Sequence, residues 1–122
     1  MKLKKRSPFV IGLAAILLAV FIGSFSMAQE AKQVIKVTAK KFEYSPSTIT
    51  VKKGVPVVLE FTSLDRLHGF NCPALGIRSD IEPGKTNTVE FTPQKAGKFP
   101  FHCDNFCGAG HEEMKGTIIV TE

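Results

Sequence analysis

Residues 102–114 read HCDNFCGAGHEEM and place two cysteines, a histidine and a methionine within one short loop. These four side chains are Cys103, Cys107, His111 and Met114. Thiolates, an imidazole and a thioether together suit copper, because methionine is a poor zinc ligand and magnesium or calcium prefer oxygen ligands. The loop therefore predicts a copper site.

The spacing of the two cysteines bears on the number of metal ions. A single-copper blue site uses one Cys, two His and a weak axial Met. Three residues separate Cys103 from Cys107, so a tight loop can turn both sulfurs inward, where each thiolate could bridge the same two ions. Each copper still needs an imidazole; His111 supplies one, and His68, 35 residues before Cys103, is the candidate for the other. Met114 is then expected as a weak axial ligand to one copper, with a backbone carbonyl of the loop serving the other.

At this point the sequence resembles a known family. The pattern Cys-x3-Cys-x3-His-x2-Met before an apolar strand is similar to the dinuclear copper centre called CuA, found in subunit II of haem-copper terminal oxidases and in nitrous oxide reductase. Residues 65–87, DRLHGFNCPALGIRSDIEPGKTN, resemble the segment that carries the first histidine ligand, and the likeness spans roughly residues 34–122. The resemblance implies a cupredoxin Greek-key sandwich, two copper ions and six ligands: the side chains of His68, Cys103, Cys107, His111 and Met114, and the backbone carbonyl of Asn105.

The chain departs from the family pattern at two points. Many members have a glutamate at the position of Asn105, and that carboxylate also reaches a magnesium or manganese ion, whereas an asparagine lacks the charge. Many members also carry a Trp-rich stretch that receives electrons from cytochrome c, and this chain has no tryptophan. Phe42 and Tyr44 are the aromatic residues of the matching stretch. The copper ligands therefore carry over, whereas the two departures weaken the case for the second metal site and for docking to cytochrome c.

The first 28 residues predict export. A basic start, an apolar run from Phe9 to Ile22 and the small residues Ser26 and Ala28 are typical of a signal peptide cleaved before Gln29. The alternative is an uncleaved membrane anchor, because residues 8–27 carry no charge and are long enough to span a bilayer. Both alternatives put the following domain in the periplasm or on the outer face of the cytoplasmic membrane.

Residues 29–122 are expected to form one all-β domain. Short β-branched or aromatic runs, separated by Pro and Gly turns, favour a two-sheet antiparallel sandwich or barrel. The runs are residues 34–38, 48–51, 55–61, 86–91, 98–101 and 116–120. Loops gather at the ends of such a sandwich, so the turn around His68 and the loop 103–114 are expected to meet at one rim. Four of the 16 basic residues lie in the leader, which leaves 12 − 11 = +1 for the domain and no electrostatic case for nucleic acid.

Several residues have a second interpretation. Cys103 and Cys107 of an exported protein can pair as a disulfide. Cys72 is expected to be a small buried hydrophobe, with a thiol near the copper as the alternative. His102 is expected to face solvent, because it alternates with Cys103 on a strand. Asp65 either orients His68 through a hydrogen bond or is a solvated loop carboxylate.

Three functions follow from these alternatives. The first is a one-electron carrier with a CuA centre, either free in the periplasm or as the electron-entry subunit of a membrane cytochrome c oxidase. Its expected partners are a c-type cytochrome as donor, the oxidase subunit and a copper chaperone, and the chain alone catalyses no reaction, because every coordination position is filled by protein. The second is a copper-delivery or chaperone protein. The third is a redox domain that works through a disulfide.

Overall fold

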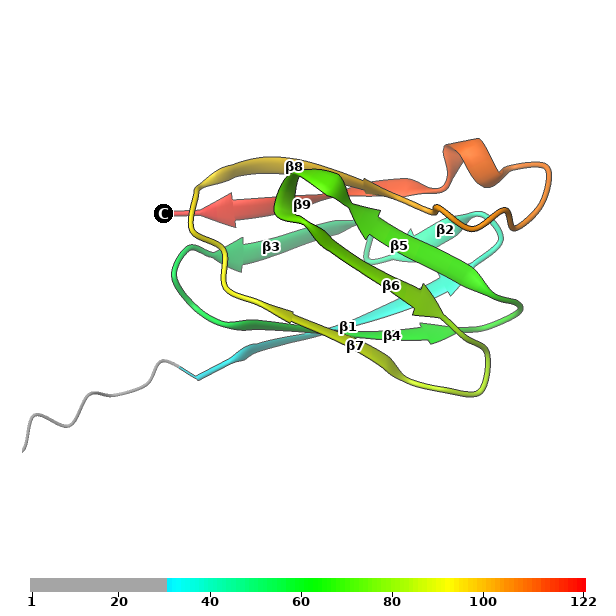
Figure 1. Ribbon diagram of the computed structural model, residues 1–122, viewed down its shortest axis with the longest axis horizontal. Helices are drawn as coiled ribbons and strands as arrows, with labels where there is room; N and C mark the ends of the chain where they lie inside the picture. The colour runs from blue at the N-terminus through cyan, green and yellow to red at the C-terminus, as the bar shows by residue number, and fades with distance from the viewer. Residues whose placement is uncertain (1–30) are drawn as a thin grey trace, which may run out of the picture.

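A computed structural model describes residues 31–122, and it shows strands arranged in two sheets that face each other (Figure 1). One sheet has the order β2-β1-β4-β7 and the other has the order β3-β9-β8-β5-β6. The strands are β1 (Gln33–Lys40), β2 (Glu43–Ser45), β3 (Thr48–Lys52), β4 (Val57–Ser63), β5 (His68–Cys72), β6 (Ile77–Ile81), β7 (Asn87–Phe91), β8 (Gly97–His102) and β9 (Lys115–Thr121). The predicted all-β sandwich is confirmed, while the predicted leader lies outside the described residues.

The expected antiparallel pairing holds for most strands and is wrong for two pairs. β1 runs parallel to β4, and β3 runs parallel to β9, whereas the other paired strands are antiparallel. The reason lies in how the chain changes sheets. After β1 the chain turns back as β2, then enters the second sheet as β3, and it returns beside β1 as β4 in the original direction. Sequence periodicity identifies strands but carries no information on this crossing.

The core lies between the sheets and is rich in aromatic rings. The rings of Phe61 and Phe70 have centroids 4.6 Å apart, and those of Phe70 and Phe101 lie 4.8 Å apart. Tyr44 meets Phe101 edge-on at 5.0 Å. Burial of aromatic rings of this size supplies much of the hydrophobic stabilisation of a small domain. The helical segments of residues 31–122 are two short 3-10 turns, and none of them is long and apolar enough to cross a membrane.

One end of the sandwich collects the loops that matter for the site (Figure 1). The loop after β8, drawn in orange, and the connection between β4 and β5 both lie at this end. β8 pairs with β9 from Gly97 to His102 but with β5 only at Asn71↔His102. Beyond His102 the chain therefore leaves the sheet and runs over the first residues of β5, which brings residues 103–114 against His68.

Candidate metal centre

The structure brings the predicted sulfur and nitrogen ligands into one cluster, which is buried except for the half-buried His111. His68, Cys103 and Cys107 each offer a ligand atom, and these atoms all lie within 4.8 Å of one another. The Sγ atoms of the two cysteines are 3.7 Å apart. Cys107 Sγ also lies 3.8 Å from the Sδ of Met114 and 3.5 Å from the Nδ1 of His111. The two segments of the chain thus meet at one rim, as the sequence predicts.

The loop between β8 and β9 is closed by its own backbone. The last pair of the β8–β9 ladder is His102↔Lys115, and the amide of Cys103 then donates to the carbonyl of Met114 at 3.0 Å. A 3-10 turn, His111–Glu113, lies directly before Met114, and the amide of Met114 donates to the carbonyl of His111 at 3.2 Å. The first and last sulfur of the loop are consequently held opposite each other by the end of a rigid ladder.

The carbonyl of Asn105 lies against one of these sulfurs. In the metal-free chain the thiol of Cys103 donates to this carbonyl, with 3.1 Å between sulfur and oxygen. Asn105 itself is half-buried. The backbone oxygen that the resemblance implies as a ligand therefore faces the thiol cluster.

His68 contributes the most informative atom of the site. Its ring is fully buried, and its Nε2 lies 2.6 Å from a carboxylate oxygen of Asp65. Because an ionised carboxylate only accepts hydrogen bonds, Nε2 of the neutral imidazole carries the proton, which leaves the lone pair on Nδ1. Nδ1 is buried and has no hydrogen-bond partner, alone among the buried side-chain nitrogen and oxygen atoms of residues 31–122. An unpaired buried acceptor is unfavourable by about 1–3 kcal/mol, and a metal ion bound beside the sulfurs would remove that penalty. The residues present therefore fit a soft metal ion.

The position of His68 differs from the expectation in one respect. The sequence suggests a turn, whereas His68 is the first residue of strand β5 and pairs with Ile81 of β6. The interpretation of Asp65 as the residue that orients His68 is confirmed by their hydrogen bond. Burial raises the pKa of Asp65, but hydrogen bonds from the amide of Lys41, from His68 and from the amide of Arg66 outweigh it and lower the pKa to about 2. Asp65 is therefore ionised at neutral pH.

Metal binding at the thiol cluster must displace protons. Burial and the neighbouring thiol of Cys103 raise the pKa of Cys107 to about 11. The thiol of Cys107 is thus protonated at neutral pH in the metal-free protein, because burial and a neighbouring thiol disfavour the thiolate. A metal ion binds the thiolate form, so that metal uptake releases protons and is opposed by acid.

The sequence analysis did not identify two residues that support the loop, Gly69 and Arg78, or the role of Asp104 within it. Gly69 donates its amide hydrogen to Cys103 Sγ at 3.4 Å, and a Cβ at Gly69 would lie 2.0 Å from Asp104 Oδ1 and 3.2 Å from the amide nitrogen of Asn105. Arg78 of β6 holds Asp104 at both oxygens, Nε to Oδ2 at 2.6 Å and Nη2 to Oδ1 at 3.0 Å. The loop therefore rests directly on the backbone of β5 and is tied to β6. The sequence places Asp104 beside Cys103, but nothing in it signals the pairing with Arg78.

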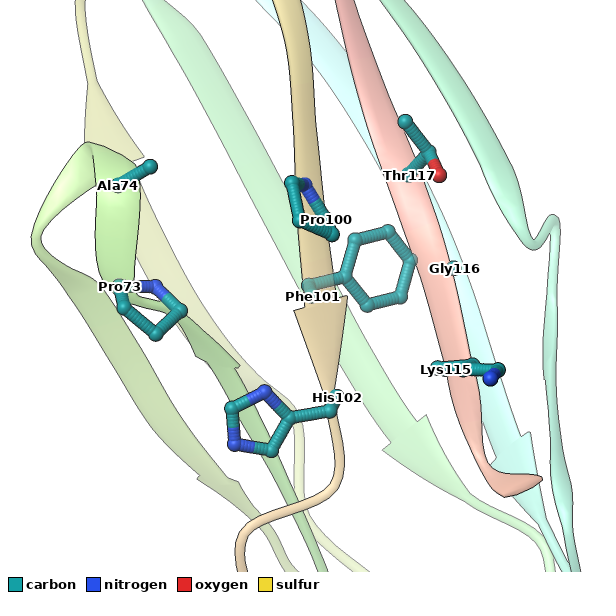
Figure 2. A pocket seen from close by; sticks show the side chains of 8 residues that line it. All are labelled: Pro73, Ala74, Pro100, Phe101, His102, Lys115, Gly116 and Thr117. Carbon is teal, nitrogen blue, oxygen red and sulfur yellow. The ribbon is translucent and has the colours of Figure 1, made fainter. Parts of the chain in front are cut away.

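Cys72 and His102 lie outside the cluster. Cys72 is buried at the far end of β5, about 13 Å along the strand from His68 at an ordinary strand rise. Its thiol lies 4.0 Å from the carbonyl of Phe99 and behaves as a small core residue. His102 is exposed, as predicted, and with Lys115 it lines one end of a hollow of about 520 Å³ on the outer face of β8 and β9 (Figure 2).

Comparisons with known proteins agree with this geometry. A family model described as a cupredoxin-like domain matches residues 13–120. The chain is 38% identical over 88 residues to cytochrome c oxidase subunit 2 of Thermus thermophilus, covering 72% of this chain and 65% of that protein. It is 34% identical over 93 residues to nitrous-oxide reductase of Cupriavidus necator, covering 73% of this chain and 14% of that enzyme.

Among solved structures, the periplasmic domain of subunit II of cytochrome oxidase from Bradyrhizobium japonicum shares the fold. The TM-score is 0.70 at 24% identity, with 79% of this chain and 88% of that chain covered. The chain spans 65% of the oxidase subunit and 14% of the reductase that it matches, so the similarity concerns one domain of these larger proteins.

Proposed function

The chain belongs to the family of cupredoxin-like domains, and we propose that it is an exported electron-transfer protein with a dinuclear copper centre of the CuA type. Copper bound at this site would accept one electron and pass it on. The proposed ligands are the side chains of His68, Cys103, Cys107, His111 and Met114 and the carbonyl of Asn105. Similarity to oxidase subunit 2 and the buried His/Cys/Cys cluster both support copper as the metal.

The observation that carries the proposal is the free nitrogen of His68. Asp65 fixes the protonated Nε2, which leaves Nδ1 as a buried lone pair without a partner. Metal-binding histidines commonly donate their second ring nitrogen to a carboxylate in this way. A histidine kept only for packing would bond both nitrogens or expose one to water. The arrangement of His68 is thus typical of a histidine that binds a metal ion.

The protein's own contribution is to hold the ligands still and dry. Cys103, Cys107 and Met114 are at most 3% exposed, and His68 is fully buried. The β8–β9 ladder fixes one side of the loop and β5 fixes the other. Rigid ligands reduce the rearrangement that accompanies a change of redox state, and two thiolates offset most of the charge of the bound ions. Such burial also disfavours a copper-delivery role, which requires easy release.

The partners follow from the relatives and remain part of the proposal. The domain would serve electron entry into a membrane oxidase, or act as a free carrier, with a c-type cytochrome as donor. Similarity to cytochrome c oxidase subunit 2 supports the first arrangement. The basic and apolar start of the sequence supports a position outside the cytoplasm.

Copper stoichiometry tests the proposal. The reduced protein, loaded with copper and freed of excess metal, should hold two ions per chain, be purple and show a mixed-valence spin signal shared by two nuclei. Cys107→Ser should abolish this spectrum, because it removes one bridging sulfur. Cys72→Ala is the matched control, since it deletes a buried thiol that lies away from the cluster, and it should leave the spectrum unchanged. One copper per chain with a blue spectrum would contradict the dinuclear centre.

A disulfide-based redox domain is the second candidate, and one distance favours it. The Sγ atoms of Cys103 and Cys107 are only 3.7 Å apart, so that a small movement would let them bond. This function gives no role to the free nitrogen of His68. It predicts activity in the metal-free protein that is lost in Cys107→Ser and kept in a His68→Gln variant, whereas the copper proposal predicts loss of the purple spectrum in both variants.

A further inference from the structure

Tyr44 is a buried hydrogen-bond donor close to the metal cluster. It lies in the middle of β2, is 3% exposed, and packs edge-on against Phe101 and Phe70 with interplanar angles of 80° and 88°. Its hydroxyl donates to the carbonyl of Gly69 at 2.6 Å. Two aromatic contacts fix the direction of the hydroxyl.

Gly69 receives this bond at the edge of β5 that faces β8. β6 pairs with the other edge of β5 at Gly69↔Asp80, whereas β8 pairs with β5 only at Asn71↔His102 and leaves its own side uncovered at Gly69. Two side chains take its place: the hydroxyl of Tyr44 binds the carbonyl of Gly69, and the sulfur of Cys103 accepts its amide hydrogen at 3.4 Å. Because Gly69 has no side chain to restrict its backbone, these two bonds set its orientation.

Building on the proposed copper centre, we propose that Tyr44 is a positioning residue for that centre, which holds the amide of Gly69 on the sulfur of Cys103 and thereby raises the reduction potential. A hydrogen bond donated to a thiolate sulfur withdraws electron density from it and favours the reduced, less positive state of the metal. Without the hydroxyl, the carbonyl of Gly69 is left unpaired in the core and its residue turns to find another partner. The bond to the sulfur then lengthens. His68, which directly precedes Gly69, is held by the same anchor.

The metal-free protein gives the first test. In Tyr44→Phe the ring and its packing remain and only the hydroxyl is lost, so we expect the amide hydrogen of Gly69 to exchange about fivefold faster or more. The matched control is Thr121→Val, which also removes a hydrogen bond from a hydroxyl to a carbonyl, that of Val51 at 3.2 Å. Thr121 is the last residue of β9, at the end of the strand away from the loop 103–114. This control should leave the exchange of Gly69 unchanged. Unaltered exchange in Tyr44→Phe would overturn the anchor.

The loaded protein gives the second test. We expect the equilibrium constant for one-electron reduction to fall in Tyr44→Phe, by up to about tenfold, which corresponds to about 59 mV. Thr121→Val should keep the wild-type potential. A potential equal to that of the wild type in Tyr44→Phe would show that Tyr44 serves stability alone.

A third measurement changes the strength of the bond instead of deleting it. Tyr44 is the only tyrosine of the chain, so that growth on 3-fluorotyrosine alters this position alone. The fluorinated phenol is more acidic and a stronger donor, and we expect slower exchange of Gly69 and a higher potential, opposite to Tyr44→Phe. Changes in the same direction as Tyr44→Phe would contradict a role of the hydrogen bond.

These outcomes separate the inference from the proposed function. If the wild-type protein takes up no copper, the proposed function fails, while the exchange of Gly69 in the metal-free protein still decides whether Tyr44 anchors that backbone. If the wild-type protein shows the dinuclear spectrum and Tyr44→Phe leaves both exchange and potential unchanged, the inference alone fails.

Discussion

Replacing Gly69 by alanine tests whether the loop of residues 103–114 packs directly on the backbone of β5. The new Cβ would lie 2.0 Å from Asp104 Oδ1, 3.2 Å from the amide nitrogen of Asn105 and 3.3 Å from its Cβ. The carboxylate of Asp104 can move away only by breaking its ion pair with Arg78, and the main-chain amide of Asn105 must also shift by a few tenths of an ångström. We therefore expect Gly69→Ala to displace the segment that carries Cys103.

The magnitude follows from two terms. Overpacking of this severity destabilises by about 3 kcal/mol, and loss of the bond from Gly69 to the sulfur of Cys103 adds about 0.5–1 kcal/mol. The sum of about 3.5–4 kcal/mol lowers the midpoint of thermal unfolding of a domain of this size by roughly 14–32 °C. The displaced loop should also fail to retain copper, because Cys103 no longer faces His68.

The assay is thermal and urea unfolding of the metal-free protein, followed by copper loading. Gly54→Ala is the control, because its φ of +77° makes alanine strained while no atom lies within 4 Å of the new Cβ; it should be destabilised by about 1–2 kcal/mol and load copper normally. Adding Asp104→Ala to Gly69→Ala should recover part of the lost stability, since the nearest overlapping atom is removed. A Gly69→Ala protein as stable as Gly54→Ala and normally loaded would refute the reasoning.

Two further predictions concern the neighbours of the cluster. The lowered pKa of Asp65 stabilises the folded protein at any pH above the pKa of this group in the unfolded chain, which is near 4. This stabilisation is lost as the pH falls toward the folded-state pKa of about 2. Allowing for the 31% exposure of the side chain, the contribution is about 1 kcal/mol. Urea unfolding of the metal-free protein should thus show wild type and Asp65→Asn differing at pH 6 and converging near pH 2, and a difference that persists in acid would contradict the role of the charge. Arg78→Ala should reduce stability by only about 0.5–1 kcal/mol, because the arginine side chain is 45% exposed and solvent screens its ion pairs. Copper should nevertheless be lost faster to a chelator, since Asp104 is released. Lys85→Ala, which breaks another exposed ion pair, should leave copper retention unchanged.

Some strands were predicted from the sequence and others were not. Runs such as residues 48–51 and 116–120 are β-branched and lie in strands β3 and β9, as predicted. β5 and β6 were missed because HGFNC and IRSDI contain glycine, asparagine and charged residues, which weaken the strand signal. These residues are strands because the sheet around them pairs their backbones, and that pairing is a property of the fold.

The sequence alone determined which metal-binding side chains the loop offers, because these residues lie close together along the chain: Cys103, Cys107, His111 and Met114. The single small β domain was likewise readable from its composition and turns. Only the tertiary structure decided that Nδ1 of His68 is free, that Arg78 holds Asp104, and that Tyr44 reaches Gly69. The physical reason is that the last two contacts join residues 25 or more positions apart, and that the burial of His68 depends on the packing of the fold; both depend on the order in which strands cross between two sheets, which no local pattern encodes.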